Sequence, residues 1–310
     1  MRPLIIAHRG ASGYLPEHTL AAKRLAHDMG ADYLEQDVVA SGDDELVVLH
    51  DIFLDRVTDV ALRFPGRERR DGRFYVRDFD LAELRALHVW ERMHADGSPV
   101  YPHRYPAKSG DFHVSTLREE LACIRRLNEQ TCRRVGVYAE IKRPAWHKAE
   151  GVDIAPRLLE QLAEFGYAER DDPVFLQCFD DAELRRLKQE LECPFRLVQL
   201  IGENSWLEAE TDFDALRTVA GIKELARTVD AIGPHLLQLY QLSETGAVAT
   251  GLVTEAHEAG LLVHPYTFRA DEIPAGFESF AQLVRYFVVE LGVDGLFTDF
   301  PDQVLRLSFP

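Results

Sequence analysis

Short apolar runs alternate with longer segments of helical periodicity along the chain. The runs have the length of buried β-strands, and the turn-rich residues 41–45 join two of them into an expected hairpin. The expected strands are 4–7, 33–40, 46–50, 135–141, 174–178, 195–201, 229–232, 261–265 and 295–298. The expected helices lie near 18–29, 114–130, 153–166, 180–191, 215–228, 244–259 and 279–291.

This alternation predicts the α/β class and, within it, a (β/α)8 TIM barrel. Counted from Leu4, with the hairpin taken as one unit, eight strands alternate with helices. An open doubly wound sheet is the alternative fold. The first strand lacks the G-x-G-x-x-G turn of such sheets, however, and Gly10 and Gly13 alone are a weak signal.

Residues 51–113 interrupt the alternation, and a single short helix, near 81–87, is expected within them. This segment carries 11 Lys and Arg against 11 Asp and Glu, whereas the rest of the chain carries 24 against 41. We therefore expect one barrel domain, 1–310, with an electrically neutral insertion after the second strand. The basic run at Arg67, Arg69 and Arg70 is expected to be a solvated loop, because Glu68 and Asp71 are beside it.

The formal charge, 35 − 52 = −17, argues against polyanionic partners. Nucleic-acid affinity comes largely from Lys and Arg, so no nucleic-acid partner is expected. No run approaches the roughly 20 apolar residues of a membrane span, so no stable membrane insertion is expected either. The first residues lack a signal-peptide apolar region, which predicts a cytoplasmic protein as the chain stands, or a periplasmic one if a leader has been removed. The oligomeric state stays open, and a homodimer is compatible with the sequence.

The four cysteines do not form a C-x-x-C pair, so neither a zinc ribbon nor a thioredoxin-type site is supported. A domain of this size can bury a core without disulfides. We expect free thiols at Cys123, Cys132, Cys178 and Cys193.

Polar side chains follow the expected strands at their carboxyl ends, where a buried charge needs a partner. In a β/α barrel these ends meet at one mouth, which is where active sites are built. Two of the carboxylates lie two residues apart on one strand and therefore point to the same face. The group consists of His8, Arg9, Glu35, Asp37, His50, Glu140 and Lys142.

Three carboxylates at one mouth would repel one another unless a cation neutralised them. Ligation by oxygen alone from Glu35, Asp37 and Glu140 suits Ca²⁺ or Mg²⁺ better than zinc. Such a cation polarises a phosphate, and histidines move protons at the attacking and leaving oxygens. The combination with His8 and His50 is typical of phosphodiester cleavage.

The same residues lie in motifs that span nearly the whole chain in order. With them the sequence resembles the glycerophosphodiester phosphodiesterase family, most closely its bacterial periplasmic-type branch. The motifs are AHRGASGYLPEHT at 7–19, YLEQDV at 33–38, LHD at 49–51, LDRVTD at 54–59, EIK at 140–142, LQCFD at 176–180, HPYT at 264–267 and GLFTDFPD at 295–302.

The resemblance implies a barrel with a family-specific insertion that matches 51–113. It implies metal-dependent hydrolysis of glycerophosphocholine, glycerophosphoethanolamine and similar small molecules to glycerol 3-phosphate and an alcohol. By position, the acid/base pair would be His8 and His50, the ligands of a divalent cation (Ca²⁺ favoured, Mg²⁺ the alternative) would be Glu35, Asp37 and Glu140, and the phosphate or substrate would contact Arg9, Lys142, Gln177 and Tyr266.

The neighbours of these residues receive structural roles. Glu17 and His18 are expected to cap the first helix and hold the loop, Asp51 to orient His50 or the loop, and Asp299 to shape its loop. Six further histidines appear without ligand spacing and are expected at the surface: His94, His103, His113, His147, His235 and His257.

Two other functions are compatible with parts of the pattern. A phospholipase D-like or phospholipase C-like enzyme would need an exposed apolar surface for membrane docking, and the mixed residues 51–113 offer little of one. A catalytically silent cation or sugar-phosphate binding protein would be expected to have lost a histidine or a carboxylate, and both histidines and all three carboxylates are present.

Overall fold

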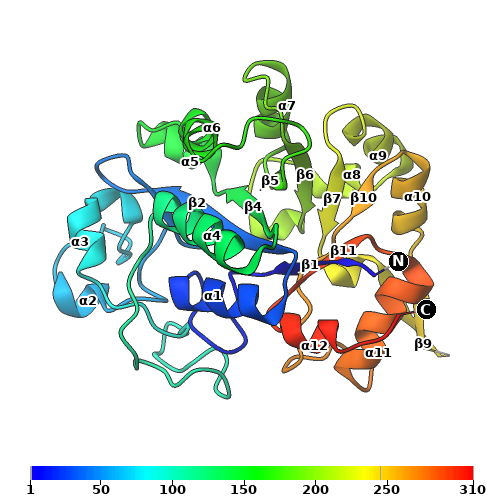
Figure 1. Ribbon diagram of the computed structural model, residues 1–310, viewed down its shortest axis with the longest axis horizontal. Helices are drawn as coiled ribbons and strands as arrows, with labels where there is room; N and C mark the ends of the chain where they lie inside the picture. Colours follow the sequence, from blue (N-terminus) through cyan, green and yellow to red (C-terminus); the bar gives the residue numbers. More distant parts are fainter. Residues whose placement is uncertain (1, 245, 310) are drawn as a thin grey trace.

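The parallel strands form a nearly closed barrel in the computed structural model, which describes residues 2–244 and 246–309 (Figure 1). They pair in the order β10-β7-β6-β5-β4-β2-β1-β11. Backbone bonds bring the two ends together, since Phe297 N–H donates to Pro265 O at 3.0 Å and Phe268 N–H to Phe297 O at 2.8 Å. The predicted barrel is confirmed. Its strands are β1 (Leu4–Ala7), β2 (Tyr33–Ala40), β4 (Gly136–Ile141), β5 (Val174–Cys178), β6 (Arg196–Ile201), β7 (Ala231–Pro234), β10 (Leu262–Val263) and β11 (Gly295–Thr298).

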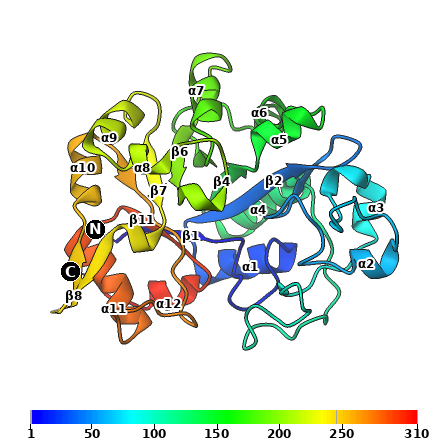
Figure 2. The same ribbon diagram turned by 180° about the vertical axis from the view of Figure 1, so that it is seen from behind.

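Helices surround the strands on the outside of the barrel (Figures 1 and 2). Caps define their ends: the Thr19 side chain accepts from Ala22 N–H at the start of the first helix, and Gly30, at φ 103°, ends it in the left-handed region. These helices are α1 (Leu20–Met29), α4 (Leu117–Thr131), α5 (Pro144–Ala149), α6 (Ile154–Glu164), α7 (Asp181–Gln189), α8 (Phe213–Leu216), α9 (Val219–Leu225), α10 (Leu252–Glu258), α11 (Phe280–Arg285), continued by a π-helical segment (Tyr286–Leu291), and α12 (Pro301–Leu305).

Two expected helices differ from the structure. The helix near 215–228 is two short helices, α8 and α9, because the Thr218 side chain caps a new helix at Gly221 N–H. The segment 244–259 becomes helical only at Leu252, and the antiparallel strands β8 (Tyr240–Ser243) and β9 (Gly246–Ala249) precede it. The hairpin exposes Leu242 and Val248, so its apolar positions do not mark a buried helix face.

The barrel interior has an apolar layer below and a polar layer above. Below, Tyr138 stacks on Phe175 with the ring centroids 4.9 Å apart. Above, neighbouring strands are in register at Asp37 with Glu140 and at Glu140 with Gln177. The alternation of side chains along strands therefore places these polar groups together at the carboxyl end of the barrel.

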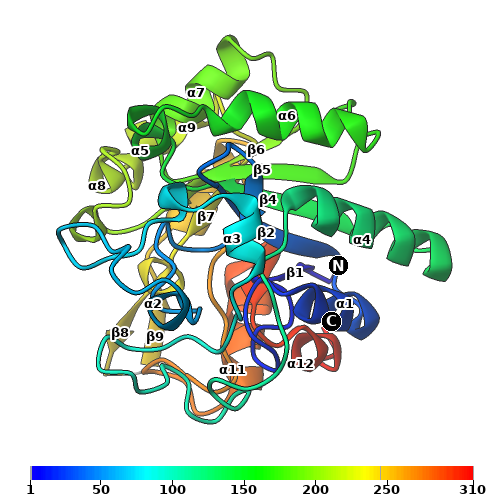
Figure 3. The same cartoon turned by 90° about the vertical axis from the view of Figure 1, so that its left-hand side faces the viewer.

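The insertion packs against the β2–β3 hairpin, where β3 is Leu46–Val48, and it lies toward the viewer in Figure 3. It contains α2 (Val60–Arg63), a 3₁₀ turn (Val76–Asp78) and α3 (Leu81–Arg85). Its buried apolar side chains form a cluster of their own with Val39 and Val47 of the hairpin.

The basic run of the insertion lies in an exposed loop, as expected, but two of its arginines form ion pairs. Arg67 pairs with Glu83, with a shortest N–O distance of 2.6 Å. Arg69 binds both Asp78 and Glu150, each at 2.7 Å. The run therefore ties the insertion to itself and to the end of α5.

None of the helices in the described ranges is long and apolar enough to cross a bilayer. The four cysteines are unpaired thiols, and Cys123, Cys178 and Cys193 are buried.

Candidate active site

A cavity of about 200 Å³ lies at the carboxyl end of the barrel strands. Eight of the nine residues expected in the site line it: His8, Arg9, Glu35, Asp37, His50, Glu140, Gln177 and Tyr266. The ninth, Lys142, is buried and is not among the described residues that line the cavity. Its Nζ lies 2.8 Å from Glu140 Oε1. Residues that the sequence did not single out complete the wall: Phe179, Leu200, Trp206, Thr267, Arg269 and Phe297.

The three carboxylates expected to bind metal converge. Glu35, Asp37 and Glu140 are buried, and each offers an oxygen within 4.8 Å of the others. Burial raises the pKa of Glu140 well above its usual range, and it also raises the pKa of Glu35. Burial would raise the pKa of Asp37 too, but the contact with His18, which hydrogen-bonds to it, and the charge of Lys142 hold that pKa well below its usual range.

The donor set fits a hard cation. All three groups are carboxylates, which Ca²⁺ and Mg²⁺ prefer over nitrogen or sulfur. Asp37 Oδ1 is buried and has no hydrogen-bond partner within residues 2–244 and 246–309. A buried oxygen without a partner is costly, and a cation between the carboxylates would remove that cost.

Glu35 is held from two sides. Arg9, at φ 57°, turns its backbone N–H toward Glu35 Oε2 at 2.7 Å, and Gln177 Nε2 donates to Oε1 at 3.0 Å. The turn leaves no room for a larger residue at Gly10, where a Cβ would lie 2.8 Å from the backbone carbon of Ala22. The first strand and α1 thus fix one carboxylate of the site.

Arg9 points its guanidinium into the same cluster. Its Nη1 donates to Glu17 Oε2 at 2.9 Å, and its Nε lies 3.6 Å from Asp37 Oδ2. Burial would lower the pKa of Arg9, but the surrounding carboxylates outweigh burial and raise it. The cavity therefore has a permanent positive charge beside the carboxylates.

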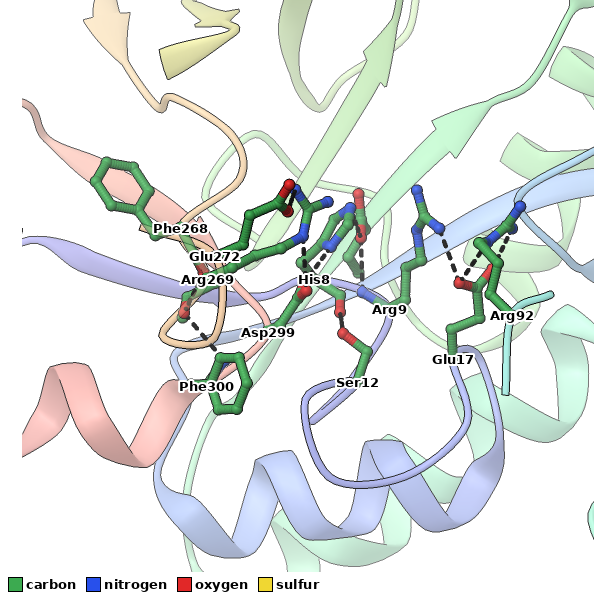
Figure 4. A network of polar contacts seen from close by, with 12 residues as sticks. His8, Arg9, Ser12, Glu17, Arg92, Phe268, Arg269, Glu272, Asp299 and Phe300 are labelled. Carbon is green, nitrogen blue, oxygen red and sulfur yellow. Dashed lines mark hydrogen bonds and ion pairs between the residues drawn. The ribbon is translucent and has the colours of Figure 1, made fainter. Parts of the chain in front are cut away.

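His8 follows β1 and lies against a buried aspartate (Figure 4). Its Nδ1 is 2.6 Å from Asp299 Oδ1, and its Nε2 is 4.0 Å from Glu35 Oε2. Burial alone would raise the pKa of Asp299, but Arg269 and His8 hold it well below its usual range. An ionised carboxylate only accepts, so Nδ1 of His8 carries the proton and Nε2 faces the site. Asp299 is thus a partner of the site and not merely the loop-shaping residue that the sequence suggested.

His50 has the matching arrangement on the other side. Its Nδ1 is 2.7 Å from Asp51 Oδ1, as expected for an orienting aspartate. Burial, with the positive charges of Arg9 and Lys142, lowers the pKa of His50 to about 4. The ring is therefore neutral near pH 7, with a free nitrogen at the cavity.

Glu17 and His18 do not cap α1 as expected, because Thr19 does. Instead, Nε2 of His18 is 2.7 Å from Asp37 Oδ2, and Lys23 Nζ is 3.3 Å from the other ring nitrogen. An ammonium group only donates, so Nδ1 of His18 accepts and Nε2 donates to Asp37. Lys23 is itself buried, pairs with Glu120 at 3.1 Å and donates to the backbone carbonyl of Glu35.

Two of the histidines expected at the surface lie elsewhere. His147 is fully buried and accepts from Ala40 N–H at 3.2 Å, and His235 lines the cavity. His113 is exposed, as expected, but it groups with His88 and Asp111 at metal-ligand spacing. In that group, however, Arg63 Nη2 lies 2.9 Å from His88 Nδ1 and sets a fixed positive charge against the ring.

Comparisons with known proteins match the chain to one family. The model of the glycerophosphoryl diester phosphodiesterase family matches residues 8–303. The chain belongs to this family. The resemblance expected from sequence and the enzyme class, a phosphoric diester hydrolase, are thereby confirmed.

Relatives match across the chain. A glycerophosphodiester phosphodiesterase of Haemophilus influenzae is 41% identical, over 96% of this chain and 88% of the relative, and one of Treponema pallidum is 37% identical, over 96% and 90%. A solved structure from Silicibacter pomeroyi has a TM-score of 0.74 at 24% identity, covering 98% of this chain and 92% of that one. A phosphodiesterase of Oleispira antarctica, solved with its product sn-glycerol-3-phosphate, has a TM-score of 0.65 at 22% identity, covering 98% and 96%. These structures share the fold.

Proposed function

We propose that this protein hydrolyses glycerophosphodiesters, such as glycerophosphocholine and glycerophosphoethanolamine, to glycerol 3-phosphate and an alcohol, and that it needs a divalent cation. One observation carries the proposal: His8 and His50, each held at Nδ1 by an aspartate, line the cavity that contains three clustered carboxylates. The relatives named as glycerophosphodiester phosphodiesterases, and the solved relative with sn-glycerol-3-phosphate, support this substrate class.

Glu35, Asp37 and Glu140 would hold the cation. When bound, the cation would neutralise and polarise the phosphate. We favour Ca²⁺ because it accepts several carboxylates in irregular geometry, whereas Mg²⁺ demands a near-ideal octahedron. Arg9 adds a permanent positive charge for the phosphate from the same cavity.

The two histidines divide the proton transfers. Nε2 of one neutral ring removes the proton from the attacking oxygen. The other ring, which has taken up a proton from solvent and is an imidazolium, donates its Nε2–H to the oxygen of the leaving alcohol. The P–O bond to the attacker forms as the P–O bond to the alcohol breaks. Water and the neighbouring glycerol hydroxyl, which would give a cyclic phosphate first, both satisfy this scheme.

Three further residues are assigned to substrate binding. Gln177 reaches the site through its bond to Glu35, and Tyr266 walls the cavity where the glycerol is expected, with its hydroxyl donating to Ile201 O at 3.0 Å. Lys142 acts from behind Glu140, as a nearby charge.

One surface feature favours activity on lipids as a second candidate. Leu237, Leu242 and Val248 are about half exposed, near the β8–β9 hairpin and not on the insertion. A groove that includes Leu237 and Leu242 shares His235, Thr267 and Arg269 with the cavity. Sedimentation with phosphatidylcholine vesicles separates the two candidates, because a hydrolase of soluble diesters stays in the supernatant.

The test of the proposal is release of glycerol 3-phosphate from glycerophosphocholine, followed with a coupled dehydrogenase. We expect release with Ca²⁺, weaker release with Mg²⁺ and none in excess chelator, with recovery when Ca²⁺ is returned. Absence of release with either ion would overturn the substrate assignment. Full release in chelator would overturn the metal requirement.

A further inference from the structure

We infer that the insertion is part of the catalytic machinery, because its Arg92 and Arg104 are positioning residues for the two histidines. The inference rests on the proposed roles of His8 and His50. Each histidine is held by an aspartate, and each aspartate gives its second oxygen to one of these arginines.

On the side of His50, the chain of contacts begins at Asp51. Its Oδ1 meets the ring, and its Oδ2 accepts from Arg92 Nη1 at 2.7 Å. Arg92 also clamps Glu17, through Nε at 3.0 Å and Nη2 at 2.5 Å, and Glu17 in turn holds Arg9 (Figure 4). The Arg92 guanidinium thus holds both Asp51, which is the partner of His50, and Glu17, which is the partner of Arg9.

On the side of His8, Asp299 is shared in the same way. Its Oδ1 meets the ring, and its Oδ2 accepts from Arg104 Nη2 at 2.8 Å and from Arg269 Nε at 2.9 Å. The side chain of Arg104 is only 3% exposed, which means that its charge was withdrawn from water to reach Asp299. The insertion therefore reaches across the chain to a loop that follows β11.

This arrangement fixes orientation as well as charge. A carboxylate bound through one oxygen can rotate, whereas one bound through both oxygens presents a fixed acceptor to the histidine Nδ1–H. That acceptor keeps the proton on Nδ1 and leaves Nε2 toward the cavity. Without Arg92, Asp51 remains partly buried but can rotate away from Nδ1, and His50 loses its single tautomer. Without Arg104, Asp299 keeps the Nε–H of Arg269 on Oδ2 but loses the second donor, so its orientation is less firmly fixed and His8 admits the second tautomer.

The kinetic test compares Arg92→Gln and Arg104→Gln with Arg73→Gln. Arg73 is a matched control, since it lies in the same insertion and pairs with Asp55 at 3.0 Å but is 37% exposed. On glycerophosphocholine we expect kcat to fall by about 10-fold or more in the first two variants and by less than about twofold in the control. For Arg104→Gln, KM should stay within about threefold, because that residue does not line the described cavity.

Two further readouts separate positioning from folding. Asp51→Asn combined with Arg92→Gln should lose little more kcat than the worse single variant, because both act through His50. Arg92→Lys and Arg104→Lys, which keep the charge and one hydrogen bond, should recover part of kcat. Additive losses, or no recovery by lysine, would overturn the inference.

A readout without turnover keeps the inference apart from the proposed function. Long-range ¹H–¹⁵N spectra of the imidazoles, assigned with His50→Gln and His8→Gln, report the tautomer of each ring. We expect Nδ1–H for both rings in the parent protein, and mixed tautomers for His50 in Arg92→Gln and for His8 in Arg104→Gln. Unchanged tautomers would overturn the positioning role, even if the parent protein hydrolysed another diester or none.

Discussion

Replacing Asp299 by asparagine tests the pairing of Asp299 with His8, because it changes one carboxylate oxygen to an amide nitrogen. Asp299 offers Oδ1 to His8 and Oδ2 to two arginines, Arg104 and Arg269. Asparagine has a single side-chain oxygen, and we expect it to accept the hydrogen bonds from the two guanidinium groups. Its amide NH₂ then faces Nδ1 of His8, makes that nitrogen an acceptor and moves the ring proton to Nε2. The neutral ring could then no longer accept a proton at Nε2, and an imidazolium would lose the anion that stabilises it, so His8 would fail as a base or as an acid.

The expected loss is large because the wrong tautomer removes a proton transfer. We expect kcat to fall by about 10³- to 10⁴-fold, the size of effect seen when an aspartate that orients a catalytic histidine becomes asparagine. This corresponds to about 4–5.5 kcal/mol in the barrier. The variant should also lose about 3 kcal/mol of unfolding free energy, because the buried Arg104 and the partly buried Arg269 lose their shared anion.

The assay is glycerol 3-phosphate release with saturating glycerophosphocholine and Ca²⁺, alongside urea unfolding. Asp271→Asn is the control, since Asp271 pairs with the same Arg104 but is partly exposed and does not touch His8. That variant should keep kcat within about twofold and lose less than about 1 kcal/mol. A folded Asp299→Asn protein with kcat within about 10-fold of the parent would refute the reasoning.

Three other changes are informative. His50→Ala should lower kcat by at least about 10³-fold while calorimetry shows unchanged Ca²⁺ binding, and retained turnover would remove His50 from the mechanism. Glu140→Gln should weaken Ca²⁺ binding by about 10-fold or more, whereas an unchanged affinity would exclude Glu140 as a ligand. Burial lowers the pKa of His147 to about 4, so its contribution to stability is present above pH 6.5 and is lost as the pH falls toward 4. His147→Gln should flatten the difference in urea unfolding between pH 7 and pH 5 by about 1–3 kcal/mol, and an undiminished difference would assign it to other groups.

The sequence predicted most of the barrel because strands that are buried on both faces appear as short continuous apolar runs. The runs 174–178 and 295–298 match β5 and β11 to the residue. The segment 240–249 was missed because Leu242 and Val248 face solvent in a hairpin, so the spacing of its apolar residues does not mark a buried face. Helix ends shifted where a local cap, such as Thr218, interrupted a continuous pattern.

The candidate site was predictable where its residues follow strands. His8, Glu35 and Glu140 are adjacent in space because the barrel brings strand ends together. Arg92 and Arg104 come from an irregular insertion. Arg92 lies 41 residues from Asp51 in the chain, and Arg104 lies 195 residues from Asp299. Asp299 lay inside a recognised motif, but its contact with His8 joins positions 291 residues apart. Composition and periodicity do not encode such contacts.

Two of the clustered carboxylates have a positively charged side chain of the protein beside them, because Lys142 contacts Glu140 and Arg9 lies beside Asp37. These contacts bear on the order of folding and metal binding. A pocket of bare carboxylates would resist closure of the barrel until an ion arrived. Here the chain brings its own cations to two of the three ligands. Folding of the barrel therefore does not require the metal ion, and the ion can bind after the cavity has formed.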